Sequence, residues 1–293
     1  MKVLSTQPNG NFSHTFQPSF RNWNRIVYRD QRPTRYIDFD SDGFCSKMFR
    51  IKHTNQTAIF RYENYLPDML DYAVKKFKHK EHVNFYSYGC SNCSEQYSIL
   101  MYLISKYGEN TAQKFTPIFA RDYDEIAILH AKSGVLPINQ QEYERIQKYT
   151  GGKFEEFFLP DKPLDFSKDE NLFVHVNPKY YSMIDIKKAD IRYDYTDIPP
   201  QNTILTTINF LPYLPDKDSQ ELVNNIANHL NKKSMWWFGP YELQSGEHLI
   251  YKARCAGFSN MKRPEGVYEK VPYPKIERIS ADILRMVNRL KSY

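Results

Sequence analysis

The chain has 293 residues, of which 41% are hydrophobic and 25% charged, and its formal net charge is +6. These values are typical of a globular protein and exclude wholesale disorder, and the length suits one main domain with an extension. No apolar run reaches the roughly 18 to 20 residues needed to span a bilayer, and the first residues lack the apolar region of a secretory signal. We therefore expect a cytoplasmic protein with no membrane insertion.

Charge and cysteine usage narrow the classes of ligand. Basic residues are interleaved with acidic ones, so nucleic acid is not expected as a partner. The longest basic cluster, Lys75 to Lys80, falls at the end of a predicted helix, where lysines suit the negative end of the helix dipole. Cys90-x-x-Cys93 has no second cysteine pair with which to bind zinc, so no metal site is expected and both are interpreted as small loop residues.

Strands and helices alternate in the first half of the chain after an irregular extension of about fifty residues. Helical spacing of apolar residues and short apolar runs predict the following elements: a helix over 66–77, a strand over 85–88, a helix capped by Asn92 or Ser94 and continuing to Tyr107, a strand near 117–120, and a helix over about 124–132 that stops at Gly134. This order is typical of βαβ units with a parallel sheet.

The pattern loosens between Leu136 and Asp190, where a short helix over 143–149 and an extended segment over 172–176 indicate either a small subdomain or a long surface excursion. It then resumes with these elements: a strand over 204–208, a helix over 219–230, a strand over 235–238, strands over 249–253 and 267–271 that form an antiparallel edge hairpin, and a helix from Ser280 whose apolar stripe indicates core packing.

The segment Phe85 to Leu100, FYSYGCSNCSEQYSIL, is the most informative one. An apolar strand passes through a turn of small residues into a helix, and in open α/β sheets such a turn and the exposed N–H groups of the helix start bind a cofactor. The residues alone leave the ligand open.

Four stretches in the same order resemble the CheR-type, S-adenosylmethionine-dependent protein-glutamate O-methyltransferases of bacterial chemotaxis. These stretches are Asn55–Arg61 (NQTAIFR), the turn just described, Phe119–Asp124 (FARDYD) and Ile204–Leu214 (ILTTINFLPYL). The resemblance implies a Rossmann-like class I methyltransferase sheet with helices on both faces. It also implies an N-terminal extension, residues 1–62, that contributes Asn55–Arg61 to the cofactor pocket, and a methyltransferase-like domain, 63–293, with the excursion or small subdomain at about 136–190.

The resemblance further assigns residues to roles. Those expected to bind S-adenosylmethionine, or its product S-adenosylhomocysteine, are Asn55, Thr57, Arg61, Cys90, Ser91, Ser94, Glu95, Asp122, Asp197, Ile198 and Asn209. Among them, Asp122 falls where the family holds the ribose hydroxyls, and Asp197-Ile198 where a pair contacts adenine. Arg61 and Tyr213 are the expected catalytic residues, because the first can orient a carboxylate and the second can shape the acceptor side by hydrogen bonding.

Four positions depart from the family pattern: Cys93 stands for a Gly, Ser94 for the first of two Glu residues, Ile208 for an Arg, and Pro240 for a His. If the glycine position demands a left-handed backbone, Cys93 costs about 1 to 2 kcal/mol there.

The resemblance implies O-methylation of a carboxylate on a protein or small-molecule acceptor. The alternative is a catalytically inactive protein that keeps the methyltransferase fold for binding or regulation.

Overall fold

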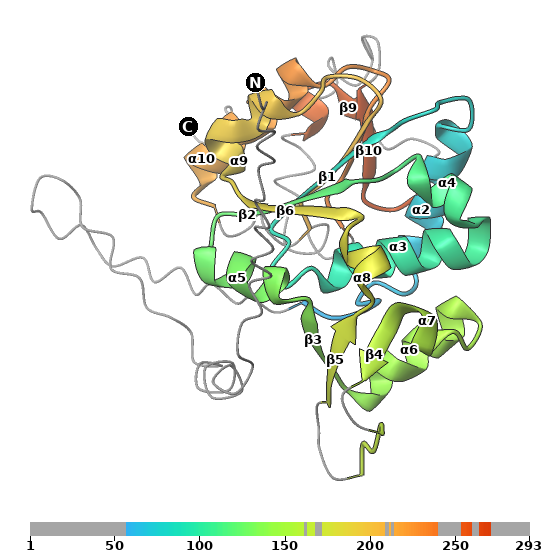
Figure 1. The fold of residues 1–293 in the computed structure, drawn as a ribbon. Coiled ribbons are helices and arrows are strands. Elements are labelled where there is room, and N and C mark those ends of the chain that lie inside the picture. The colour runs from blue at the N-terminus through green and yellow to red at the C-terminus, as the bar shows by residue number, and fades with distance from the viewer. Residues whose placement is uncertain are drawn as a thin grey trace, which may run out of the picture. The chain divides into compact units, whose positions relative to one another are not determined.

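A computed structural model of the chain describes residues 57–160, 163–167, 172–208, 211, 214–239, 253–259 and 264–270 (Figure 1). The extension of about fifty residues and the helix expected from Ser280 lie outside these residues. None of the described helices has the length and apolar character needed to cross a membrane.

A seven-stranded sheet with the order β6-β2-β1-β7-β8-β10-β9 forms the main body. Its strands are β1 (Asn84–Tyr88), β2 (Ile118–Asp122), β6 (Ile184–Lys188), β7 (Thr203–Thr206), β8 (Met235–Trp237), β9 (Phe258–Ser259) and β10 (Val267–Lys270). The first five strands in this order run parallel, whereas β10 is antiparallel to both β8 and β9. The carboxyl ends of the five parallel strands therefore form one edge of the sheet, called here the carboxyl edge, and their starts form the opposite amino edge.

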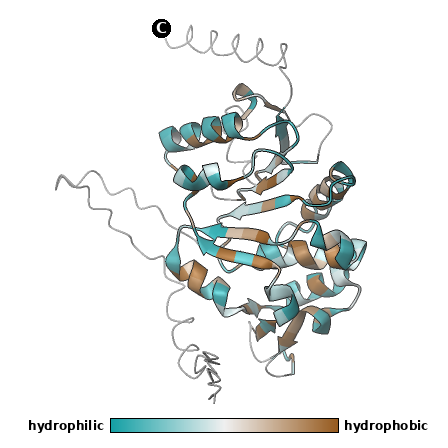
Figure 2. Ribbon diagram, turned by 45° about the horizontal axis from the view of Figure 1, so that its top comes forward, coloured by the Kyte–Doolittle hydropathy of each residue, from teal (hydrophilic) through white to brown (hydrophobic). Residues whose placement is uncertain are grey.

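Helices pack on both faces of this sheet because its strands are apolar on both sides. In β1, Phe85 belongs to one buried cluster and Tyr86 to the other, as expected when successive side chains point to opposite faces. In Figure 2, the hydrophobic residues (brown) gather in the strands and the surrounding helices carry much of the hydrophilic surface (teal). The helices are α2 (Leu66–Lys76), α3 (Ser94–Tyr107), α4 (Glu109–Gln113), α5 (Glu125–Ser133), α9 (Ile191–Asp194) and α10 (Asp216–His229), and η2 (Tyr195–Asp197) is a short 3-10 helix. The predicted Rossmann-like fold is confirmed.

The excursion after Gly134 contains a second sheet with the antiparallel order β3-β5-β4, which lies with α6 and α7 beneath the main body in Figure 1. Its elements are β3 (Val135–Ile138), α6 (Gln140–Thr150), α7 (Phe154–Phe157), β4 (Phe158–Pro160) and β5 (Leu172–Val176), and α8 (Pro178–Tyr181) follows them. The backbone N–H of Val176 donates to the carbonyl of Gly134 at 2.8 Å, so the chain enters and leaves this insert at adjacent points.

Two predicted segments differ from the structure. The main sheet resumes at β6, inside the expected excursion. The sequence pattern did not indicate this strand, because β6 is an edge strand with exposed lysines at its end and lacks a continuous apolar run. In the edge hairpin, the strand that pairs with β10 is Phe258–Ser259, and Ala253, expected in that strand, begins a short helical turn. Residues 249–252 lie outside the described part.

Candidate functional site

The turn between β1 and α3 has a left-handed backbone at two residues that are not glycine. The N–H of Cys93 donates to the carbonyl of Cys90 at 2.8 Å, which closes the turn. Ser91 has φ 49° and Cys93 has φ 69°, and both side chains are buried. A left-handed conformation costs a non-glycine residue about 1 to 2 kcal/mol. The family's glycine position thus keeps its conformation in this chain, although a cysteine occupies it.

The first turn of α3 takes its cap from Asn92. Cys93 is the N-cap residue and makes no side-chain capping bond, whereas Asn92 Oδ1 accepts from the Ser94 N–H at 3.0 Å and from the Ser94 hydroxyl at 2.7 Å. Of the two predicted caps, Asn92 therefore supplies the acceptor and Ser94 is the first helical residue. The Ser94 hydroxyl is therefore bonded within the turn that precedes α3.

Glu95 brings a carboxyl group to this helix start. It is partly buried, and no hydrogen bond or ion pair to another described residue holds it. Burial raises the pKa of the Glu95 carboxyl to about 8, and the positive charge of Arg61 opposes this rise. A carboxyl that has no hydrogen-bond partner and a pKa raised toward neutral pH is typical of a ligand-binding site.

Residues 57–61, called here the strap, lie against the first turn of α3. The N–H of Phe60 donates to Ser98 Oγ at 2.8 Å, and that hydroxyl donates to the carbonyl of Ser94 at 2.7 Å. The N–H of Ile59 donates to Glu142 Oε1 at 2.8 Å, which joins the strap to the insert. These bonds bring Arg61, which is exposed, near Glu95. The structure thus brings the strap and the turn together, as the resemblance implies.

The end of β2 is tied to the same turn through Asp122. Its Oδ2 accepts from the Ser91 N–H at 2.9 Å, and its Oδ1 accepts from the Asp124 N–H at 3.0 Å. The N–H of Cys90 also donates to the carbonyl of Arg121 at 3.1 Å. Asp122 therefore lies at the carboxyl edge beside the turn, where the resemblance expects it.

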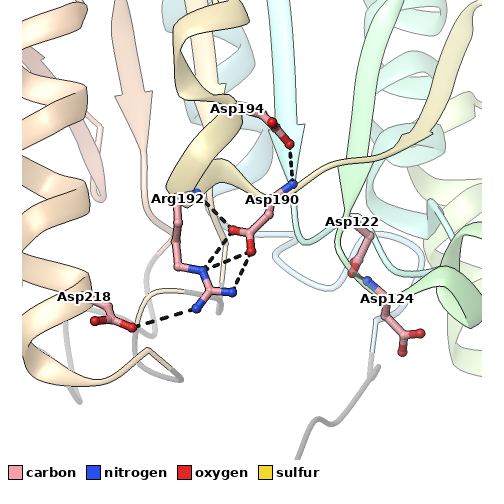
Figure 3. A network of polar contacts seen from close by, with 6 residues as sticks. All are labelled: Asp122, Asp124, Asp190, Arg192, Asp194 and Asp218. Atoms are coloured by element: carbon pink, nitrogen blue, oxygen red, sulfur yellow. Dashed lines mark hydrogen bonds and ion pairs between the residues drawn. The ribbon is translucent and has the colours of Figure 1, made fainter. Parts of the chain in front are cut away.

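A second carboxylate, Asp190, follows β6 at this edge (Figure 3). Its two oxygens accept from Arg192 Nε at 3.0 Å each, and Oδ2 also accepts from Arg192 Nη2 at 2.6 Å. Arg192 Nη1 lies 3.8 Å from a carboxylate oxygen of Asp218 at the start of α10. Arg192 thus links the loops after two strands of the sheet. The sequence interpretation missed Asp190, which only a recognised β6 strand could have shown.

The structure separates Asp197 and Ile198 from this group. Asp197 ends η2, and its carbonyl accepts from the Tyr86 hydroxyl at 3.3 Å. Ile198 is fully buried, and its carbonyl oxygen bonds to His229 at the end of α10. Ile198 immediately precedes the loop that leads into β7 at the amino edge. Ile198 is thus a core residue, whereas Asp197 is exposed, and Asp190-Ile191 follows the strand beside β2.

The remaining predicted positions divide into three groups. Thr57 is part of the strap. Asn55, Asn209, Tyr213 and Pro240 lie outside the described residues. Ile208 is 8% exposed and packs against Gly239, where an added Cβ would approach Ile208 Cγ2 to 2.9 Å. The residue that replaces the family's arginine is thus turned into the core.

Comparison with known proteins bears on this site. The family model described as the CheR methyltransferase, SAM binding domain, matches residues 55–254. The magnesium protoporphyrin IX methyltransferase from Synechocystis PCC 6803 with bound SAM has a TM-score of 0.34 and 13% identity, over 72% of this chain and 78% of that one. A TehB-like SAM-dependent methyltransferase from Corynebacterium glutamicum ATCC 13032 Kitasato has a TM-score of 0.37 and 14% identity, over 71% and 89%. No curated protein matches the sequence.

The match to this family model and the strand order identify a SAM-dependent methyltransferase domain of Rossmann-like fold. Because the family model covers more than half of the chain, the chain belongs to the CheR methyltransferase family. The cofactor of this domain is S-adenosylmethionine, as the resemblance implies.

Proposed function

We propose that this chain transfers a methyl group from S-adenosylmethionine to a carboxylate on a protein or small-molecule acceptor, and that the donor binds where the strap, the β1–α3 turn and Asp122 meet. The observation that carries the proposal is the Glu95 carboxyl, which no hydrogen bond or ion pair within the described residues holds and which lies near Arg61 at a helix start.

The residues present suit the chemistry of the donor. Its ammonium needs an acid, and Glu95 supplies one in place of the glutamate that Ser94 replaces. Its carboxylate needs a cation, which Arg61 supplies from the strap. Asp122 is the proposed acceptor for the ribose hydroxyls, because it is the carboxylate at the end of β2 beside the turn. Backbone atoms of Cys90, Ser91 and Ser94 line the same turn.

The adenine side is assigned to the loop that follows β6. Asp190-Ile191 replaces Asp197-Ile198 in this proposal, because it is the pair at the carboxyl edge. Arg192 holds the Asp190 carboxylate in one orientation. Asn55 and Asn209 keep the roles that the resemblance implies.

Methyl transfer to a carboxylate requires little of the protein beyond position and charge. The acceptor is already anionic, so no strong general base is needed, and alignment with the donor's sulfonium accounts for most of the acceleration. Arg61 lies where it can orient an acceptor carboxylate, and Tyr213 is the proposed hydrogen-bonding residue on the acceptor side. Because Ile208 replaces the family's arginine and is buried, Arg61 is the one of these two arginine positions that keeps a cation.

Two measurements test this function. Calorimetry with S-adenosylhomocysteine is expected to show binding that Asp122→Ala weakens at least tenfold, and Asp68→Ala, at an exposed aspartate of α2, is the control. Transfer of labelled methyl to proteins of a cell extract is expected to give products that release methanol in alkali, because carboxyl methyl esters hydrolyse there. Arg61→Ala should abolish this label.

The outcomes separate the alternatives. Alkali-stable label would replace the carboxylate by a nitrogen or sulfur acceptor. Donor binding without transfer to any acceptor would favour the inactive binding protein, which the buried Ile208 supports. Absence of binding at millimolar ligand contradicts both.

A further inference from the structure

The amino edge of the main sheet, opposite the proposed donor site, carries a concentration of positive charge. The described loops that lead into β2, β1, β7 and β8 comprise residues 114–117, 77–83, 199–202 and 230–234, called here the amino-edge loops. They contain five lysines, namely Lys78, Lys80, Lys114, Lys232 and Lys233, against a single carboxylate, Glu81. None of these lysines forms an ion pair with another described residue.

Backbone hydrogen bonds show that these loops lie side by side. The N–H of Val83 donates to the carbonyl of Lys114 at 2.7 Å, and the N–H of Asn84 donates to Asn202 at 2.9 Å. The N–H of Asn231 donates to the carbonyl of Pro200 at 2.8 Å. Four neighbouring strands span about 15 Å, so the five lysines share one strip of roughly that width.

Helix capping accounts for only part of this strip, since Lys114 is the C-cap of α4 but the other four lysines lie beyond the C-caps of α2 and α10. Lysines in the last turn of a helix are favoured by its dipole, and Lys75 and Lys76 in α2 fit that explanation. The dipole effect falls off within one turn, whereas Lys78 and Lys80 follow the end of α2, and Lys232 and Lys233 follow the end of α10.

We propose that the amino-edge loops bind an acidic segment of a protein partner, about five or more residues rich in glutamate or aspartate. An extended chain advances about 3.4 Å per residue, so such a segment covers the strip. Charge complementarity would guide its approach. The strip has no exposed Phe, Tyr or Trp on which bases could stack, since Phe77 and Phe115 are buried and its exposed rings are the imidazoles of His79 and His82, and there is no arginine among its cations. Both features favour a peptide over nucleic acid.

The test uses the full chain and a fluorescein-labelled peptide of about eight glutamates. We expect saturable binding at low salt that weakens steeply as the ionic strength rises. Lys78→Glu/Lys232→Glu should weaken binding at least tenfold. Lys132→Glu/Lys153→Glu makes the same change in net charge at exposed positions elsewhere and should change binding less than twofold.

Three results would overturn the proposal: no binding at low salt, an equal loss in both double variants, or tighter binding of a duplex RNA of matched charge that the amino-edge variant abolishes. Donor affinity is measured on the same variants and is expected to stay unchanged, because the strip lies at the opposite edge of the sheet. The two proposals can thus fail separately.

Discussion

Two helices that each follow a strand begin in opposite ways. At α6, Asn139 Oδ1 accepts from the Glu142 N–H at 2.9 Å and Glu142 Oε2 accepts from the Asn139 N–H at 3.0 Å, a reciprocal capping box. At α3, the N-cap Cys93 is left-handed and makes no side-chain capping bond, and the Glu95 carboxyl has no hydrogen-bond partner among the described residues. The first start is satisfied by its own side chains. The second has a strained turn and a carboxyl without a hydrogen-bond partner, and it is the helix start at which we propose that the donor binds.

The largest effect is expected at the satisfied start. Glu142 is buried, and its carboxylate accepts from the backbone of both Asn139 and Ile59. Glu142→Ala leaves two N–H groups without acceptors and should lower the free energy of unfolding by about 2 to 5 kcal/mol. Denaturant unfolding measures this loss. Glu144→Ala, an exposed neighbour on α6, should change it by less than about 0.5 kcal/mol, and equal losses would contradict the role given to Glu142.

The open start should instead control ligand affinity and its pH dependence. Glu95 must ionise to pair with the donor's ammonium, and its pKa is about 8, so donor affinity should rise as the pH increases toward 8. Glu95→Gln should reduce affinity about ten- to hundredfold at pH 8 and flatten the profile, since a charged hydrogen bond contributes about 1.5 to 3 kcal/mol. Calorimetry from pH 6 to 9 tests this, and a profile that Glu95→Gln leaves unchanged would exclude Glu95.

The Glu95 carboxyl should also make stability depend on pH, but in the direction opposite to donor affinity. Its folded pKa lies above the unfolded value of 4.5, so the folded chain binds the proton more tightly and stability from this group falls as the pH rises from 4.5 through about 8. Glu95→Gln should therefore be more stable than the parent above pH 8, in the absence of donor. Glu144→Gln, exposed on α6, is the control and should show no such difference.

A smaller effect is expected from relieving the strain of the turn. Cys93 is buried, so Cys93→Gly and Cys93→Ala both lose the packing of its side chain, but only Cys93→Gly relieves a left-handed conformation that costs about 1 to 2 kcal/mol. Because a glycine also adds entropy to the unfolded chain, Cys93→Gly should be more stable than Cys93→Ala by about 0.5 to 1 kcal/mol in thermal unfolding. Equal stabilities of the two variants would contradict the strain assigned to Cys93.

A change of similar size is expected at the N-cap of α6. Asn139→Ala removes the N-cap acceptor and should cost about 1 kcal/mol, and Asn139→Asp should retain most of the stability. If Asn139→Ala cost nothing in thermal unfolding, the contrast between the two helix starts would rest on Glu142 alone.

The central strands and the turn after β1 could be predicted from sequence because they are buried and carry strong local signals. β1, β2, β7 and β8 are short apolar runs followed by turn residues, and the capping acceptor Asn92 was among the two expected. A left-handed backbone at Cys93 was considered only as a condition on the family's glycine position, and the structure has it.

Edge elements could not be predicted because their pattern depends on neighbours. β6 and β9 each have one partner strand, so they need little apolar sequence, and Asp190 was missed along with β6. The pair Asp197-Ile198 was expected to contact adenine because of its position in the resemblance, yet Ile198 is a core residue. The link from Ile59 to Glu142 joins residues 83 positions apart, and nothing in either local pattern indicates it.

That link has a consequence for how such a domain can be recombined. The insert begins and ends at adjacent points, since Val176 bonds to Gly134, and its geometry alone would allow one insert to be exchanged for another. The strap, however, takes its acceptor for Ile59 from the insert and its acceptor for Phe60 from α3. A transplanted insert without a carboxylate at the position of Glu142 would loosen the segment that carries Arg61. The insert and the strap would therefore have to be exchanged together.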